Sequence, residues 1–173
     1  MTYYFFGFLF LFLDFGIQFP YGGTLYLVPI GYALLILASM RLGHENDRFR
    51  RLKLLTPIAF VLSLGVFVLK LCALSLPMVA ELVISVVMTV ASLYVAYEFA
   101  EGAKALERSL YKKLDADKIS AAWIILAMAS LLTFLSIYFK DVALPCAFVK
   151  LLAIVWFEVA TYQFERKLKE TKK

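Results

Sequence analysis

Charged side chains that interrupt long apolar stretches are the residues of this sequence best suited to chemistry. Eight of them lie outside the segments rich in lysine and arginine: Asp14, Lys70, Glu81, Glu98, Lys140, Asp141, Lys150 and Glu158. A charge near the centre of a bilayer costs roughly 2.5–3.5 kcal/mol on insertion scales, so each needs a partner, an aqueous cavity or a nearby interface. These residues are therefore the first candidates for a binding site.

Five polar residues are predicted to gather in the outer half of a helical bundle and to line one shared site: Asp14, Gln18, Lys70, Glu81 and Lys150. On a helix, Asp14 and Gln18 would share a face because they are four residues apart. Mixed charges of this kind suit a zwitterionic or anionic small molecule. Two alternatives stay open. In the first, pairs of acidic residues and lysines only hold the helices together as buried ion pairs, while lysines near helix ends extend outward. In the second, Asp14 and Glu158 belong to a proton or ion relay.

The sequence lacks the residues that other classes of chemistry require. The chain has one histidine, His44, and two cysteines, Cys72 and Cys146, which argues against a histidine-based metal centre and a disulfide framework. The two cysteines are predicted at similar depths, where one disulfide or two free thiols would fit. The sequence contains no GxSxG, HExxH, CxxC or phosphate-binding loop signature. We therefore expect neither an enzyme nor a cofactor.

The composition indicates which elements must position these residues. Apolar residues make up 63% of the 173-residue chain and charged residues 18%, whereas soluble domains average roughly 45–50% and 25%. Six apolar stretches are long enough to cross a bilayer, which takes about 17–25 residues: 3–19, 24–40, 54–74, 78–99, 119–139 and 142–164. None alternates with the period of a strand, so we predict an all-α polytopic membrane protein, with residues 1–173 forming one six-helix transmembrane domain.

The positions of the basic residues predict how the chain is threaded. Fifteen of the 18 lysines and arginines fall in 41–54, 100–118 and 165–173, each of which follows an apolar stretch. The positive-inside rule therefore predicts cytoplasmic termini and three outward hairpins in a bacterial plasma membrane. The first residues lack the features of a cleaved signal peptide, so we expect the first helix to stay as an anchor. The net charge of +5 is expected to attract anionic lipid headgroups rather than nucleic acid.

The second basic segment has helical periodicity of its own. Ala103, Leu106, Leu110 and Leu114 recur at helical spacing between charged residues. This pattern predicts that the fourth helix continues along the cytoplasmic interface. A solvated connector is the alternative.

The start of the second predicted helix carries a resemblance. The residues Tyr26-Leu27-Val28-Pro29-Ile30-Gly31-Tyr32 follow an aspartate in the first helix, Asp14. Over roughly the first 55 residues the chain resembles a group of small, uncharacterised polytopic bacterial membrane proteins. The resemblance implies a bacterial inner membrane and carries no activity with it.

Two functions fit these features. The first is the binding or transport of a small molecule at the outward-facing polar site. The second is an accessory or regulatory membrane subunit that acts through contacts with another protein or with anionic lipid. A homo-oligomer is compatible with both.

Overall fold

The computed structural model describes residues 3–13, 16–18, 24–72, 77–136 and 139–171. Its elements in chain order are α1 (Tyr3–Phe12), β1 (Gly16–Gln18), β2 (Thr24–Tyr26), α2 (Val28–Leu42), α3 (Asp47–Leu71), α4 (Met78–Leu110), α5 (Ala116–Leu135), a single 3-10 turn (Lys140–Val142) and α6 (Ala143–Thr171).

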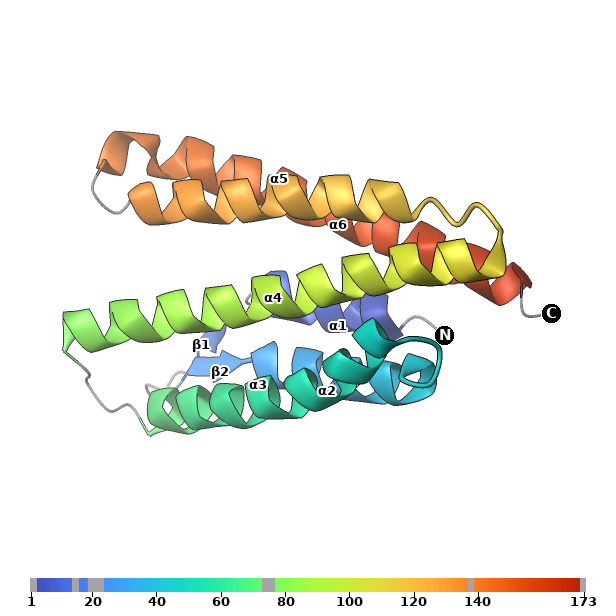
Figure 1. The fold of residues 1–173 in the computed structure, drawn as a ribbon. Helices are drawn as coiled ribbons and strands as arrows, with labels where there is room; N and C mark the ends of the chain where they lie inside the picture. The colour runs from blue at the N-terminus through green and yellow to red at the C-terminus, as the bar shows by residue number, and fades with distance from the viewer. Residues whose placement is uncertain (1–2, 14–15, 19–23, 73–76, 137–138, 172–173) are drawn as a thin grey trace.

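The six helices of this described part lie roughly along one direction (Figure 1). Consecutive helices pack against each other, and α1 also packs against α6. The bundle therefore closes on itself, with the start of the chain beside its end. Both termini lie at the same end of the bundle (Figure 1). The largely helical architecture predicted from the composition is confirmed.

Four helices are long and apolar enough to cross a membrane: α3, α4, α5 and α6. The helices α1 and α2 have 10 and 15 residues. At 1.5 Å per residue they reach about 15 and 22 Å, which is shorter than the roughly 30 Å hydrocarbon core. Neither helix crosses a bilayer by itself.

The predictions of unbroken helices over 3–19 and 24–40 were wrong at the facing ends of these ranges. A short antiparallel hairpin stands there, with Gly16 opposite Tyr26, Ile17 opposite Leu25 and Gln18 opposite Thr24. The sequence between the strands contains a proline and two glycines, which disfavour helix and favour a turn. The strands pair with each other and β2 also packs against α3, so backbone groups outside the helices still find hydrogen-bond partners.

The predicted extension of the fourth helix is confirmed. The helix α4 continues without a break to Leu110, and Ala103 and Leu106 are buried along it. Leu114 is buried as well but lies beyond the helix end. Two other helices also reach into the basic segments, since α3 begins at Asp47 and α6 ends at Thr171.

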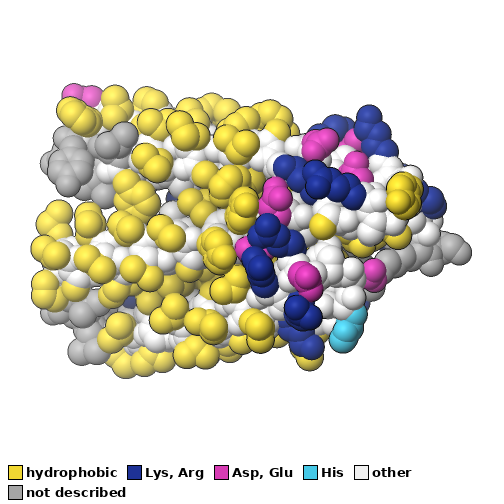
Figure 2. All heavy atoms as spheres, viewed as in Figure 1, with side chains coloured by type: hydrophobic (Ala, Val, Ile, Leu, Met, Phe, Trp, Pro, Cys, Tyr) yellow, Lys and Arg dark blue, Asp and Glu magenta, His cyan; other side chains and the backbone are white. Residues whose placement is uncertain are grey.

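Charged side chains gather at one end of the molecule, and hydrophobic side chains cover the rest of the visible face (Figure 2). We call the part formed by residues 41–54, 100–118 and 165–171 the charged end, and the part formed by residues 64–72, 78–91 and 141–152 the apolar half. No residue of these three apolar ranges is buried. The buried core extends instead from the middle of the bundle into the charged end.

Candidate functional site

The structure places the five residues of the predicted outer site unevenly. Asp14 lies outside the described residues, and Gln18 belongs to a strand, so the helical face that they were predicted to share is not formed there. Lys70 lies in the last turn of α3 and Glu81 in the first turn of α4, and both are exposed. Lys150 is half-buried on α6. A site shared by these residues stays a prediction.

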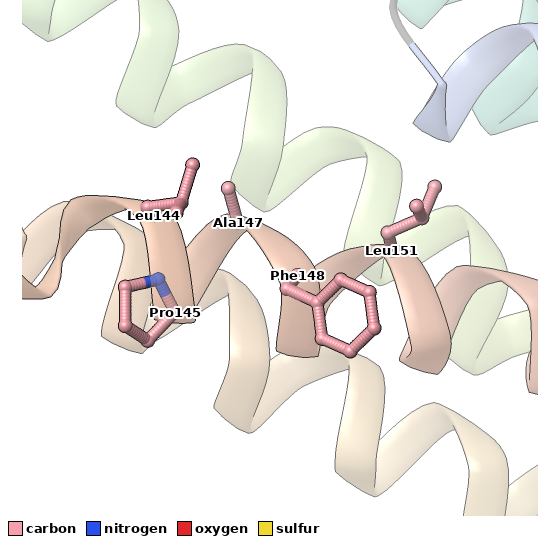
Figure 3. A pocket seen from close by; sticks show the side chains of 5 residues that line it. All are labelled: Leu144, Pro145, Ala147, Phe148 and Leu151. Atoms are coloured by element: carbon pink, nitrogen blue, oxygen red, sulfur yellow. The ribbon is translucent and has the colours of Figure 1, made fainter.

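A shallow, open groove lies on the surface of one helix, α6, in the apolar half, beside Lys150 in sequence. Its volume is about 520 Å³, and its lining consists of α6 side chains (Figure 3): Leu144, Pro145, Ala147, Phe148 and Leu151. The groove is thus apolar, and it lies in the part of α6 where no residue is buried. Cys72 and Cys146 are both free thiols.

Near the charged end, a buried glutamate is neutralised by an arginine. Glu98 of α4 is 1% exposed, and both of its carboxylate oxygens accept hydrogen bonds from Arg48 of α3, at 3.2 and 3.3 Å. Asn46 caps α3 by accepting from the Phe49 amide at 2.9 Å, and its side-chain amide donates to the Gly102 carbonyl at 2.9 Å. These contacts fasten the start of α3 to α4, so Glu98 has a structural role.

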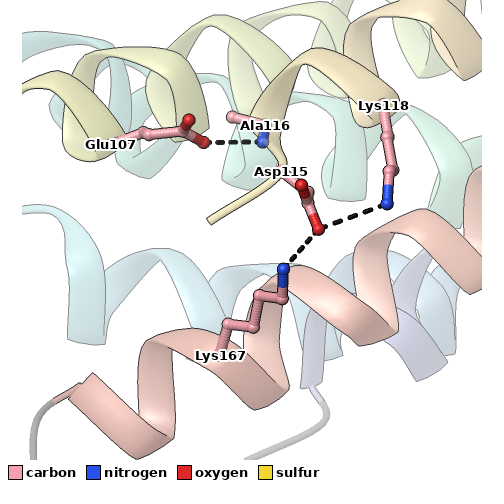
Figure 4. Close-up of polar contacts among 5 residues, drawn as sticks. All are labelled: Glu107, Asp115, Ala116, Lys118 and Lys167. Atoms are coloured by element: carbon pink, nitrogen blue, oxygen red, sulfur yellow. Dashed lines mark hydrogen bonds and ion pairs between the residues drawn. The ribbon is translucent and has the colours of Figure 1, made fainter. Parts of the chain in front are cut away.

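The turn between α4 and α5 is also held by charge (Figure 4). Asp115 accepts hydrogen bonds from Lys167 of α6 and from Lys118 of α5, the latter at 3.2 Å. These two ammonium groups hold the pKa of Asp115 below its usual value. Glu107 accepts from the Ala116 amide at 2.7 Å, which satisfies one free N–H at the start of α5. The contacts tie α4, α5 and α6 together at the charged end.

Aromatic rings fill the core beside this end. The Phe99 ring lies 4.5 Å from Tyr4, 5.2 Å from Phe8 and 5.9 Å from Phe164, measured between centroids. Phe8 in turn contacts Phe157 at 5.2 Å. The rings come from α1, α4 and α6, and they exclude water from the place where these helices meet.

Polar oxygens without partners lie next to these rings. Tyr4 of α1 and Glu158, Thr161 and Glu165 of α6 form what we call the buried oxygen cluster. Glu158 is 3% exposed, Thr161 0% and Tyr4 2%, and Glu165 is half-buried. Both oxygens of Glu158, the hydroxyls of Thr161 and Tyr4, and one oxygen of Glu165 have no hydrogen-bond partner in the described part of the chain.

The geometry of α6 brings three of these side chains to one face. Glu158, Thr161 and Glu165 have the spacing i, i+3 and i+7, which aligns them along the helix. The second oxygen of Glu165 accepts a hydrogen bond from the Tyr4 amide at 3.2 Å, which fixes the start of α1 against the cluster. Glu165 is also close enough to Glu158 for its charge to act on that carboxyl group.

Most buried hydroxyls of this bundle behave differently from that of Thr161. The hydroxyls of Thr56, Ser92 and Ser130 each donate to the carbonyl four residues earlier in their own helix, all at 2.8 Å. Ser92 also contacts the Tyr32 hydroxyl at 3.0 Å, which forms an interhelical hydrogen bond between α2 and α4. Thr161 makes neither kind of contact, which leaves its oxygen available to a ligand.

The sequence pointed to only one member of the buried oxygen cluster. Glu158 is a candidate because it is a charged residue within the apolar stretch 142–164. Glu165 was counted with the basic C-terminal segment, and Tyr4 and Thr161 were not singled out. The spacing of the three polar residues on α6 was the available signal, whereas the contribution of α1 depends on tertiary packing.

Comparison with known proteins adds no further assignment. No family model matches the chain, and neither the curated proteins nor the solved structures contain a match.

Proposed function

We propose that the protein is an integral membrane protein that binds or transports a small molecule at its apolar half, which we place toward the outside of a bacterial plasma membrane. The observation that carries this proposal is the uneven packing of the bundle. The core is continuous toward the charged end, whereas residues 64–72, 78–91 and 141–152 contribute no buried side chain. A bundle closed at one end and loosely packed at the other has room for a ligand at the open end.

The orientation rests on charge. Both termini lie at the charged end (Figure 1), and fifteen of the 18 basic residues belong to its segments or directly follow them. Basic residues favour the cytoplasmic side and anionic headgroups. In this orientation the groove and the predicted ligand residues Lys70, Glu81 and Lys150 belong to the outer half, together with Asp14 and Gln18.

The groove suggests the kind of ligand. Small-molecule sites are mostly apolar with a few polar groups, and they typically measure about 300–1,000 Å³. The groove has about 520 Å³ and an apolar lining, and Lys150 precedes its last lining residue. We therefore infer an amphipathic ligand, with an apolar body in the groove and an anionic or zwitterionic head near Lys150.

Native mass spectrometry of the protein extracted gently from its own membrane tests this proposal. The wild type is expected to carry a bound mass of a few hundred daltons. Ala147→Phe fills the groove and should reduce that bound fraction about tenfold, which corresponds to about 1.4 kcal/mol of lost affinity. Val149→Phe is the matched control, because Val149 is exposed on the same helix but does not line the groove. A wild type without a bound molecule, or equal retention by both variants, would contradict the proposal.

The second candidate function is an accessory subunit. It is favoured by the exposed apolar side chains of α4, including Met78, Val79, Val83 and Val90, which leave this helix free to pack against another protein. A stoichiometric protein partner in the same spectra, with no small ligand, would favour this function. A second copy of the chain would instead indicate a homo-oligomer.

A further inference from the structure

The buried oxygen cluster has the composition of a cation site. Its unpartnered atoms are all oxygens: two from Glu158, one from Glu165 and one each from Thr161 and Tyr4. Carboxylate and hydroxyl oxygens are the preferred ligands of hard cations. A buried carboxyl group without a hydrogen bond or counter-charge is strongly destabilising. The cluster therefore needs a proton or a cation to be stable.

The hydroxyl of Thr161 is the observation that separates this cluster from a chance pair of acidic residues. A buried threonine on a helix normally bonds back to a carbonyl three or four residues earlier, as Thr56 does in α3. Thr161 is fully buried and lies between Glu158 and Glu165 on the same face of α6, yet its oxygen makes no such bond. It is thus available to a ligand that the carboxyl groups hold.

The charge of the cluster limits the ligand to a single positive charge. The Glu165 charge acts on Glu158, the N-terminal ammonium acts on Glu165, and α1 contributes the amides of Tyr4 and Phe5 and the Tyr4 phenol. Two like charges in one buried site do not ionise together without a counter-ion. With the N-terminal ammonium balancing one carboxylate, one small cation or one proton balances the other. Among the described residues, no group of three His, Cys, Asp or Glu side chains could hold a metal ion, which disfavours a divalent metal.

The cluster is nearest to water on the side of the charged end. Glu165 is only half-buried and lies one residue before Arg166, in the part of α6 that leaves the apolar core. Glu158 lies two turns deeper, against the aromatic rings. An ion that reaches Glu165 from the aqueous side therefore meets Thr161 and then Glu158 along one helix face.

We propose that Glu158, Thr161, Glu165 and Tyr4 form a binding site for a small monovalent cation, which enters in exchange for a proton of the carboxyl pair. On binding, one O–H bond of the pair is broken, its proton leaves to water, and the cation takes the freed carboxylate oxygen as a ligand. No oxidant or reductant is involved. Cation binding here does not require a ligand in the groove, and in a transporter it would supply the coupling ion.

Thermal unfolding of the purified protein in detergent tests the site. The probes are the chlorides of Na⁺, Li⁺, K⁺ and NH₄⁺ at 100 mM, compared with N-methyl-D-glucamine chloride at equal ionic strength. At least one small cation is expected to raise the Tm by about 5 °C, as occupancy of a native-state site does. The rise should be larger at pH 8 than at pH 6, because protons compete for the same oxygens. A weakly buffered sample should release up to about one proton per bound cation, because cation ligands must be deprotonated.

Two variants and a control assign the effect to this cluster. Glu158→Gln should abolish the cation-dependent rise in Tm, and Thr161→Val should weaken apparent cation affinity about tenfold while keeping the fold. Thr56→Val is the matched control and should bind like the wild type, because its hydroxyl already donates to the Leu52 carbonyl. Equal stabilisation by all five salts, or an unchanged rise in both cluster variants, would overturn the site. Because the mass-spectrometric test reports on the groove, failure of one proposal is distinguishable from failure of the other.

Discussion

The same substitution at two fully buried threonines is expected to have opposite effects on stability. Thr161 and Thr56 are both 0% exposed, and in each case Val replaces a hydroxyl by a methyl group of nearly the same shape. Thr56 donates to the Leu52 carbonyl at 2.8 Å and contacts the Ser39 hydroxyl at 3.4 Å. The Thr161 hydroxyl has no partner in the described part of the chain. The two sites therefore differ in the hydrogen bonding of the hydroxyl that Val removes.

The magnitudes follow from that difference. A buried polar group left without its hydrogen bond costs about 1–3 kcal/mol, whereas a typical formed bond contributes about 0.5–1.5 kcal/mol. In cation-free buffer, Thr161→Val should therefore raise the free energy of unfolding by about 1–2 kcal/mol, and Thr56→Val should lower it by about 1 kcal/mol. Ser39 keeps its own bond to the Ile36 carbonyl in the second variant. For a chain of this size, about 2–4 °C of Tm corresponds to each kcal/mol.

The assay is thermal unfolding in detergent, in a buffer where N-methyl-D-glucamine replaces all inorganic cations. A rise of about 4 °C for Thr161→Val and a fall of about 3 °C for Thr56→Val are expected. Addition of the cation that the site binds should then raise the Tm of the wild type above that of Thr161→Val, because the wild type gains a ligand that the variant holds poorly. If Thr161→Val lowers the Tm as much as Thr56→Val, the Thr161 hydroxyl has a partner within the fold, and the reasoning for the cation site fails.

Two further predictions concern packing and the charged end. A Cβ at Gly31 would lie 2.8 Å from the Gly7 carbonyl oxygen and 3.0 Å from a backbone nitrogen of α1, so Gly31→Ala should destabilise by about 1–3 kcal/mol. A Cβ at Gly65 would have no atom within 4 Å, so Gly65→Ala should instead stabilise the fold by roughly 0.5–1 kcal/mol. If thermal unfolding gives Gly31→Ala the higher Tm of the two variants, the close α1–α2 contact is refuted. Because the pKa of Asp115 is lowered in the folded state, its contribution to stability is complete above its ordinary pKa, which is about 3.9, and is lost as the pH falls through the lower value. The difference in Tm between wild type and Asp115→Asn should therefore be full at pH 6 and shrink toward pH 2; a difference that is constant with pH would contradict the role of Lys167 and Lys118.

The long helices could be predicted because a helix that crosses a membrane must be apolar over the whole thickness of the bilayer. The ranges 54–74, 78–99, 119–139 and 142–164 correspond to α3, α4, α5 and α6. The predicted boundaries differ most from the observed helix ends at the charged end, because hydropathy falls there while the helix continues. Charged residues are compatible with a helix that leaves the bilayer, and Asn46 supplies a cap for α3 that begins earlier than hydropathy suggests.

The hairpin between α1 and α2 shows what hydropathy does not determine. Strand and helix residues in an apolar stretch have the same transfer free energy, so residues 16–18 and 24–26 look like continuations of the flanking helices. The local signals for a change are Gly16 and the proline and glycines between the strands. The predicted helix over 3–19 therefore included Gln18, which belongs to β1.

The buried oxygen cluster was predictable in part. The type and depth of Glu158 showed that it needed a partner. Thr161 and Glu165 were visible as its neighbours on one helix face, but threonines on helices usually satisfy themselves. Tyr4 lies more than 150 residues away in sequence, and only the packing of α1 against α6 brings it to the cluster.

The two deeply buried glutamates of the bundle differ in how their charge is balanced. Glu98 and Glu158 are 1% and 3% exposed and lie in the same aromatic region of the core. Glu98 receives two hydrogen bonds from Arg48, and a paired ion of this kind is complete within the fold. Glu158 receives none in the described residues and faces a second carboxyl group instead. Within the described residues the fold supplies an arginine to Glu98 but no basic side chain to Glu158, so the charge of Glu158 is left to a proton or to the cation that we propose.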